Sequence, residues 1–331
     1  MIKLNLDRAV REIEKRKPKL VVVQIPEGLK VRAEEIIEKI ESTGTECIVL
    51  MDPCFGACDL AGDKAEKLGA DLLVHFGHSK MHRSNNALFF PLFYSIDENK
   101  MVTQIGNLEG ELKKRNLKNI CLASTIQFTD HMNFVRESLG KKFKIHVGKG
   151  SSRISKEGQV LGCNYSSFQN VREKCDAVVF IGDGLFHPLG FTFLTDKPVF
   201  IFNPLGGEIR ELGEERELFL RKRHGAIASA QNAHSFAILI STKSGQMFKE
   251  RAGELRKLIK SKGKKAIILA MDYIMPEYLL GVEVDAYVNT ACPRIVIEDY
   301  SSFKKPILNP TELEIVLGKK KWEEFKLDEL D

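Results

Sequence analysis

Three short apolar runs are spaced along the chain, and each of them ends in polar turn residues. They begin at Leu20 (LVVVQ), Ile120 (ICLAS) and Ala237 (AILIS). A run of about four to eight apolar residues between turn signals is typical of a strand that is buried on both faces of a parallel sheet. The pattern therefore predicts three buried parallel strands that lie far apart in the sequence.

Two further landmarks follow each run at a nearly constant distance. An aspartate before small and β-branched residues lies 51, 56 and 48 residues after the start of the run, counted from 20 to 71, 120 to 176 and 237 to 285. A proline segment (PLF, PVFIFNP or PILNP) follows 20, 22 and 21 residues later, at positions 91, 198 and 306. Landmarks that recur in the same order and spacing indicate an internal repeat.

The segments between the landmarks predict helices that alternate with further strands. Apolar residues at positions 33, 36, 37 and 40 follow the spacing of an amphipathic helix, and an apolar run at 47–51 then predicts a strand. Residues 255, 258 and 259 precede a similar run at 266–271. Alternation of strands and helices is typical of parallel sheets that are covered on both faces. We therefore predict an α/β fold of three similar small parallel-sheet units, which arise from an internal triplication and pack around a central site.

The spacing of the landmarks also predicts where the units begin and end. We expect the first unit at residues 1–97, the second at 98–205 and the third at 206–331, where the third begins with a charged linker helix over 206–233. Within that helix, the basic run at 221–224 (RKRH) is expected to form a solvated face.

Composition and charge narrow the functional classes. The chain has 331 residues, 43% hydrophobic and 29% charged, and a formal net charge of +5 that is spread over its length. This charge is too weak and too mixed to indicate direct binding of nucleic acid. No apolar run approaches the ~18–20 residues of a membrane span, and the first residues lack the apolar region of a signal peptide. We expect a cytoplasmic protein without a membrane partner.

The seven cysteines carry the candidate chemistry. Their odd number and scattered positions make a disulfide framework implausible. Ligands bind outside the carboxyl ends of parallel strands, and Cys54, Cys163 and Cys292 fall in such loops, one in each unit. Cys58, four residues after Cys54, is the alternative in the first unit. The remaining three, at positions 47, 121 and 175, lie in or beside apolar strands and are expected to be packing residues.

Three thiolates that converge on one point have a chemical meaning. They suit a 4Fe-4S cluster with one iron left free to bind a substrate. Two other interpretations stay open. All seven cysteines could be incidental in a non-redox α/β ligand-binding protein, or Cys54, Cys58, Cys163 and Cys292 could form a structural zinc site. Cys292 follows the third strand of its unit whereas Cys54 and Cys163 follow the second, so convergence is a hypothesis about geometry that the repeat does not require.

Five segments make the chain resemble the archaeal diphthamide biosynthesis enzymes, which use a noncanonical radical S-adenosylmethionine mechanism. They are residues 51–59 (MDPCFGACD), 75–79 (HFGHS), 182–188 (GDGLFHP), 241–246 (STKSGQ) and 289–295 (NTACPRI). The resemblance implies a homodimer in which Cys54, Cys163 and Cys292 hold a 4Fe-4S cluster that an external electron donor reduces. It further implies cleavage of S-adenosylmethionine to methylthioadenosine and a 3-amino-3-carboxypropyl radical, and transfer of that group to C2 of a histidine imidazole in translation elongation factor 2. This transfer is the first step of diphthamide synthesis.

Polar residues and glycines at the ends of strands are the candidates for binding and catalysis in this reaction. We expect Gly182, Asp183 and Gly184 to approach the ribose or amino group, and Ser241, Lys243 and Gln246 to hold the methionine carboxylate; ordinary turn chemistry is the alternative for both sets. Gln24 and Glu27 are further binding candidates at the end of the first strand. His78 and His187 are candidate acceptors for the proton that the imidazole loses, with a purely structural hydrogen bond as the alternative.

Overall fold

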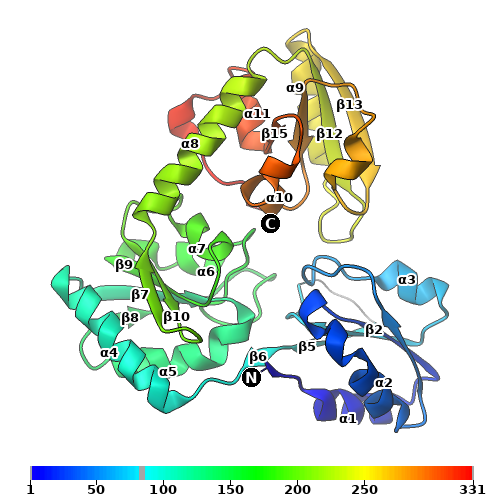
Figure 1. Cartoon of the computed structure of the whole chain (residues 1–331), viewed down its shortest axis with the longest axis vertical. Coiled ribbons are helices and arrows are strands. Elements are labelled where there is room, and N and C mark those ends of the chain that lie inside the picture. Colours follow the sequence, from blue (N-terminus) through cyan, green and yellow to red (C-terminus); the bar gives the residue numbers. More distant parts are fainter. Residues whose placement is uncertain (1, 82–85, 330–331) are drawn as a thin grey trace.

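The computed structural model describes residues 2–81 and 86–329, and it confirms an α/β fold with three separate sheets (Figure 1). The sheet of the first unit has the strand order β3-β2-β4-β5, and all its neighbours are parallel. Its strands are β2 (Leu20–Gln24), β3 (Glu46–Leu50), β4 (Leu72–Gly77) and β5 (Ala87–Pro91). Its helices are α1 (Leu6–Arg16), η1 (Glu27–Arg32), α2 (Ala33–Glu41) and α3 (Gly62–Lys67). A short antiparallel pair joins β1 (Ile2–Lys3) to β6 (Phe93–Tyr94).

The second unit repeats this order and adds one antiparallel strand at its edge, which gives β8-β7-β9-β10-β11. Its strands are β7 (Asn119–Ser124), β8 (Lys144–His146), β9 (Ala177–Ile181), β10 (Val199–Asn203) and β11 (Glu208–Glu211). Its helices are α4 (Glu98–Lys114), η2 (Ile126–Phe128), α5 (Thr129–Leu139), α6 (Ser166–Gln169), η3 (Arg172–Lys174) and α7 (Phe186–Phe191).

The third unit has the parallel order β13-β12-β14-β15. Its strands are β12 (Ser235–Ser241), β13 (Lys265–Met271), β14 (Ala286–Asn289) and β15 (Ile307–Leu308). Its helices are α8 (Gly213–Ala230), α9 (Lys249–Ser261), η4 (Pro276–Leu279), α10 (Arg294–Ile297), η5 (Tyr300–Ser302), α11 (Pro310–Val316) and η6 (Trp322–Glu324). In each unit the first strand thus lies between the second and the third.

The recurring aspartates have the same structural role in all three units. Each lies directly before the third strand, and its carboxylate accepts two backbone N–H groups at the start of the first strand. Asp71 accepts from residues 19 and 20 at 2.7 and 3.1 Å, Asp176 from residues 118 and 119 at 3.0 and 2.8 Å, and Asp285 from residues 234 and 235 at 2.8 Å each. These hydrogen bonds hold the pKa of the Asp71 and Asp176 carboxyls below its ordinary value, and for Asp285 the Ser235 hydroxyl makes the largest contribution, to which the backbone groups add. The proline landmark is less regular, because Pro91 ends β5 whereas positions 198 and 306 precede their strands.

The segment between the second and third units differs from the predicted linker helix. Residues 208–211 form β11, which pairs with β10, so the second sheet continues past residue 205. Ile209 packs against the core of the second unit, and this contact outweighs the helix preference of the charged residues around it. The helix itself, α8, begins at Gly213 and connects the two units along the outside of the molecule (Figure 1).

The basic run on α8 is not a wholly solvated face, because Arg223 is fully buried. Its guanidinium donates to both carboxylate oxygens of Glu312 at 2.6 and 2.7 Å and to the carbonyl oxygen of Ile307 at 2.8 Å. A buried charge needs such a set of partners. The prediction for this position was therefore wrong: α8 packs against α11 and β15 through an ion pair.

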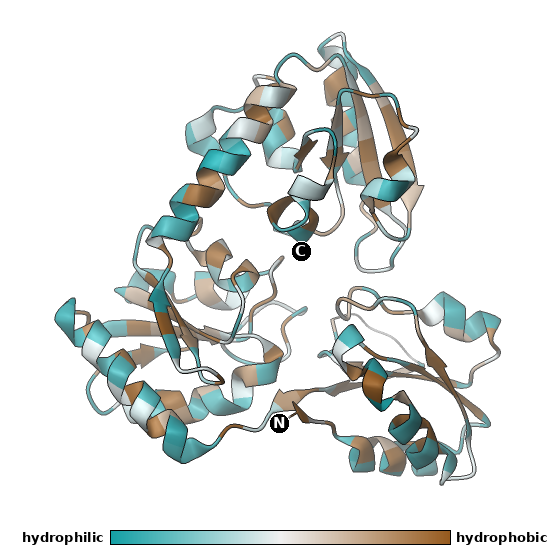
Figure 2. Cartoon of the chain, in the orientation of Figure 1, coloured by the Kyte–Doolittle hydropathy of each residue, from teal (hydrophilic) through white to brown (hydrophobic). Residues whose placement is uncertain are grey.

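The three units form an arc whose concave side is closed by loops and by the C-terminal segment (Figure 1). The central strands and the inward faces of the helices are hydrophobic, whereas the outer helix faces are polar (Figure 2). Glu329 reaches from the third unit to the second, where it accepts from the backbone N–H of Tyr165 at 3.1 Å and from Gln169 at 2.8 Å. Within the described residues, none of the helices is both long and apolar enough to cross a membrane.

Candidate functional site

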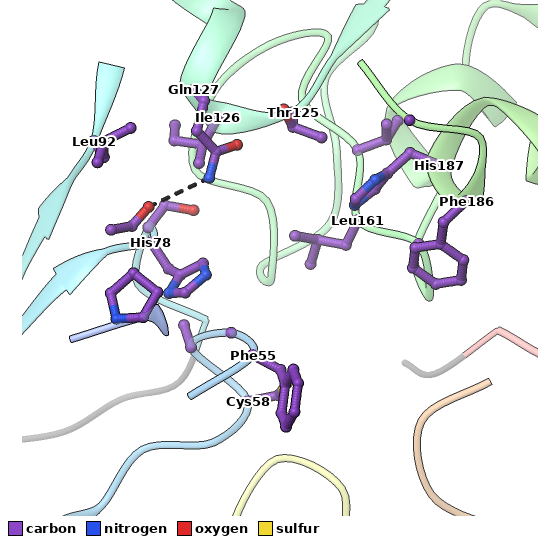
Figure 3. A pocket seen from close by; sticks show the side chains of 18 of the residues that line it. Phe55, Cys58, His78, Leu92, Thr125, Ile126, Gln127, Leu161, Phe186 and His187 are labelled. Carbon is purple, nitrogen blue, oxygen red and sulfur yellow. Dashed lines mark hydrogen bonds between the residues drawn. The ribbon is translucent and has the colours of Figure 1, made fainter. Parts of the chain in front are cut away.

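Loops from all three units line one cavity of about 510 Å³, inside the arc. The lining segments follow the carboxyl ends of strands: residues 77–79 follow β4, 125–128 follow β7, 183–187 follow β9, and Cys292 follows β14. Figure 3 shows the cavity from nearby, with His78 and Phe55 of the first unit facing Leu161 and His187 of the second. A cavity of this size at the ends of parallel strands is typical of a ligand site.

Three thiols from the three units line this cavity: those of Cys58, Cys163 and Cys292. Burial raises the pKa of Cys163 to about 12, and it also raises the pKa of Cys58 and of Cys292. The neighbouring thiols add to the effect, since Cys58 raises the pKa of both other groups and Cys163 raises that of Cys292. All three therefore carry their protons in the absence of a nearby cation.

Cys54 lies in a different place from these three thiols. It is buried, it does not line the cavity, and its sulfur groups with ring nitrogens of His75 and His78, all within 4.8 Å of one another. Burial raises the pKa of its thiol to about 12. The structure thus brings together Cys58, Cys163 and Cys292, and it separates Cys54 from Cys163 and Cys292 by turning it toward the histidines.

The loop that carries Cys58 is held by the third unit. The backbone N–H of Gly245 donates to the carbonyl oxygen of Cys58 at 3.0 Å, and the side-chain amide of Gln246 donates to its sulfur at 3.2 Å. Gly56 permits the tight turn within the loop, because a Cβ there would lie 3.2 Å from the Cys58 sulfur. Gln246 was expected to bind the methionine carboxylate. It lines the cavity, but its side-chain amide is already bonded to the Cys58 sulfur.

Lys243 was expected to bind the same carboxylate, and it has a different partner. Its ammonium lies 2.7 Å from the carboxylate of Asp59 and 3.6 Å from the ring centre of Tyr273, and its side chain is only 7% exposed. Neither Lys243 nor Ser241 lines the cavity; the Ser241 hydroxyl donates to the carbonyl oxygen of Asp272 at 3.0 Å. This lysine joins the first unit to the third.

The two candidate histidines both line the cavity, on opposite sides (Figure 3). Burial lowers the pKa of His78 and of His187 to about 4, and the charge of Arg294 adds to the effect at His187. The His187 ring stacks on Phe180 with 6.1 Å between ring centres. Both imidazoles are therefore neutral near pH 7, and a neutral imidazole can accept a proton.

Of the remaining predicted residues, some line the cavity and others do not. Asp183 and Gly184 line the cavity, and Gly184 has a φ of +72°, which a side chain rarely adopts. Gly182 directly follows β9 but is not among the lining residues. Gln24 is buried against His75, and Glu27 pairs with Lys30 at 2.6 Å on η1, so neither lines the cavity.

Sequence reasoning missed several lining residues. Phe55, 57% exposed beside Cys58, and Arg294, two residues after Cys292, both line the cavity, as do Gln127 and Phe186. An aromatic residue between two cysteines of a strand-end loop was a usable signal, because such loops form the ligand sites of parallel sheets. Gln127 carried no such signal, since only the fold brings it within 3.4 Å of the Gly77 carbonyl oxygen (Figure 3).

The three cysteines predicted to pack in the core do so. Cys47 belongs to the core of the first unit, and Cys121 and Cys175 belong to one core cluster of the second. All three are buried. They are removed from the cavity, so its soft donor set consists of the three converging thiols.

Comparison with known proteins gives a consistent result. Residues 25–326 match a family described as putative diphthamide synthesis protein. The chain is 36% identical over 324 residues to 2-(3-amino-3-carboxypropyl)histidine synthase of Pyrococcus horikoshii, covering 97% of this chain and 92% of that protein. The protein of the same name from Methanocaldococcus jannaschii is 34% identical over 350 residues, covering 99% of this chain and 95% of that protein.

A solved structure is similar over the whole chain. The crystal structure of Dph2 from Pyrococcus horikoshii with a 4Fe-4S cluster superimposes with a TM-score of 0.91 and 33% sequence identity. The match covers 100% of this chain and 95% of that one. The human protein named 2-(3-amino-3-carboxypropyl)histidine synthase subunit 1 is more distant, at 28% identity over 97% of this chain and 73% of its own length.

Proposed function

The chain belongs to the diphthamide synthesis family, and from this premise we propose that it is a 2-(3-amino-3-carboxypropyl)histidine synthase. It transfers the 3-amino-3-carboxypropyl group of S-adenosylmethionine to C2 of a histidine imidazole in translation elongation factor 2. The observation that carries the proposal is the convergence of three thiols, one from each unit, on a single cavity. The names of the similar proteins support the product, a histidine that carries a 3-amino-3-carboxypropyl group.

The donor set fits a 4Fe-4S cluster with three protein ligands. We assign these ligands to Cys58, Cys163 and Cys292, and thus replace Cys54 in the assignment made from the sequence. Burial raises the pKa of all three thiols, and Cys58 raises the pKa of Cys163 and of Cys292 further, so deprotonating them requires a compensating cation that a cluster would provide. When bound, such a cluster supplies the single electron that breaks the bond between sulfur and Cγ of S-adenosylmethionine.

The residues of the chain bind the substrate and accept the proton that the reaction releases. The cavity holds S-adenosylmethionine next to the thiols of Cys58, Cys163 and Cys292. Asp183 and Gly184 line the same cavity, as does Gln246, which is bonded to the Cys58 sulfur. Overall, one S–C bond and one C–H bond break while one C–C bond forms, so the transfer is redox-neutral and releases one proton from C2. His78 and His187, both neutral and both lining the cavity, are the proposed acceptors.

The proposed partners are those that the resemblance to the family implies. The protein substrate is elongation factor 2, the electron comes from an external donor, and the active species is a homodimer in the cytoplasm. The proposed function needs no membrane and no direct contact with nucleic acid.

The first experiment compares metal binding in matched cysteine variants. Chains with Cys58→Ala, Cys163→Ala, Cys292→Ala or Cys54→Ala are reconstituted with iron and sulfide under anaerobic conditions. We expect the absorption band near about 400 nm, bleached by dithionite, in the wild type and in Cys54→Ala, and its loss in the other three. Incubation of reduced wild type with S-adenosylmethionine and elongation factor 2 should release methylthioadenosine and add one aminocarboxypropyl group.

Two results would overturn the proposed function, and a third would change only the assignment of its ligands. A colourless wild-type protein would favour a non-redox ligand-binding protein. Stoichiometric zinc with no visible absorption would favour a structural zinc site. Loss of the band in Cys54→Ala but not in Cys58→Ala would return the third ligand to Cys54.

A further inference from the structure

Three buried polar side chains form a hydrogen-bonded chain from the backbone of residues 59–61 to the cavity. Its first member, Gln24, has its orientation fixed by two backbone groups. Its Nε2 donates to the carbonyl oxygen of Asp59 at 2.6 Å, and its Oε1 accepts from the N–H of Ala61 at 3.1 Å. Since a carbonyl only accepts and a backbone N–H only donates, the side-chain oxygen must face the next member.

The next member is His75, whose ring is fully buried. Its Nδ1 lies 2.9 Å from Oε1 of Gln24, so Nδ1 carries the proton. Burial lowers the pKa of His75 well below its ordinary value, and the ring is neutral. A neutral imidazole has a single N–H, so Nε2 of His75 is an acceptor.

The last member is His78, whose Nδ1 lies 3.0 Å from that acceptor. Nδ1 of His78 must therefore donate. The ring is neutral, because burial lowers its pKa to about 4, and its Nε2 keeps a free lone pair. The neighbouring Cys54 is a neutral thiol, so there is no thiolate there to attract the proton. His78 lines the cavity.

We infer that Gln24 and His75 are positioning residues that hold His78 in the tautomer with its lone pair on Nε2, ready to accept a proton from a ligand in the cavity. The inference rests on the proposed function for the source of that proton, the C2–H group of the substrate imidazole. After C2 has formed its bond to the transferred carbon, its proton passes to Nε2 of His78, and the single electron spent on breaking the S–C bond is released again, so that the imidazole regains its aromaticity and the transfer is redox-neutral. This assigns a role to Gln24 other than the direct substrate contact expected from the sequence.

The tautomers are measurable without any activity. The full chain, labelled with ¹⁵N in histidine and not yet reconstituted with iron, is studied by long-range ¹H–¹⁵N NMR near pH 7, with His75→Gln and His78→Gln to assign the signals. We expect both rings to be protonated on Nδ1. Gln24→Leu should release His78 to a mixture of tautomers, whereas Gln24→Glu should retain the wild-type signals, because its buried carboxyl stays protonated and so keeps both the donor to Asp59 and the acceptor for His75.

Kinetics then test the consequence. In reconstituted protein, Gln24→Leu should lower kcat by about tenfold and His78→Gln by about 10²-fold, as expected for loss of a general base. The KM for S-adenosylmethionine and the iron content should not change, and Gln24→Glu should recover most of kcat. A role for Gln24 in folding alone would instead lower the iron content and kcat together.

The outcomes separate the inference from the proposed function. Protonation of His78 on Nε2 in the wild type, or unchanged tautomers in Gln24→Leu, would overturn the inference whatever the activity. Wild-type kcat in His78→Gln would overturn the role as proton acceptor. If the tautomers are as expected but no aminocarboxypropyl group is transferred by the wild type, the proposed function fails.

Discussion

Replacing Lys243 by Met distinguishes a structural latch from a substrate contact. The change removes the ammonium that lies 2.7 Å from the Asp59 carboxylate, and Asp59 is only 8% exposed. Loss of one partner from a buried ion pair costs about 3–5 kcal/mol, because the remaining charge stays buried and uncompensated. We therefore expect the free energy of unfolding, measured by urea titration, to fall by this amount.

The second partner and a matched lysine make the measurement specific. The double variant Lys243→Met with Asp59→Asn has no uncompensated charge, so it should recover most of the lost stability. Lys257→Met, on the exposed face of α9, should change the free energy of unfolding by no more than about 0.5 kcal/mol. Hydrogen exchange should show that residues 55–61 open more readily in Lys243→Met, since this loop is held by the third unit.

A substrate role gives the opposite pattern. If Lys243 held the methionine carboxylate, Lys243→Met would weaken binding of S-adenosylmethionine while the free energy of unfolding stayed at the wild-type value. Asp59→Asn would then bring no recovery. That combination, measured by calorimetry and urea titration on the same samples, would refute the latch.

Three other predictions concern separate sites. Arg223→Met should lower the free energy of unfolding by about 3–5 kcal/mol, because it leaves Glu312 buried and unpaired, and adding Glu312→Gln should restore most of the loss in urea titrations. Burial raises the pKa of Glu314, but the ammonium groups of Lys320 and Lys319 outweigh burial and hold this pKa at about 2. The ionised carboxylate therefore stabilises the fold above its ordinary pKa of 4.5, and this stability is lost as the pH falls from 4.5 toward 2. In an acid titration followed by circular dichroism, Glu314→Gln should remove the loss of stability in this pH range. Gln246→Leu should lower the midpoint potential of the reconstituted cluster, because it removes an N–H donor to the Cys58 sulfur, and an unchanged potential in a redox titration followed by electron paramagnetic resonance would contradict this.

The parts of the fold that depend on local pattern could be predicted from the sequence. The apolar runs that begin at Leu20, Ile120 and Ala237 lie in β2, β7 and β12, because a strand buried on both faces must be apolar throughout. The amphipathic spacing at 33–40 likewise lies in α2. Residues 208–211 could not be assigned in this way, since four mostly charged residues become a strand only through pairing with β10.

The sequence predicted which loops form the site, but not which side chains in those loops line the cavity. Cys54 and Cys58 were alternatives on the basis of spacing, and what distinguishes them is contact with Gly245 and Gln246, nearly two hundred residues away in the sequence. Lys243 looked like an anion-binding residue because its partner, Asp59, is equally remote. Polar side chains at strand ends show where ligands bind, but their partners are set by the packing of one unit on another.

The aspartates before the third strands imply a division between the two ends of every sheet. Asp71, Asp176 and Asp285 close the amino ends of the strands in the same way, so three equivalent supports point their carboxyl ends at one cavity. Substitutions at the amino ends of the strands are restricted because they would destabilise the fold. The loops at the carboxyl ends do not make these hydrogen bonds, and they are free to differ in length and sequence. A scaffold with threefold repetition can thus carry a cavity without it, in which Cys292 follows the third strand of its unit whereas Cys58 and Cys163 follow the second. Exchanging loops between units is accordingly a practical way to redesign the cavity while leaving the framework intact.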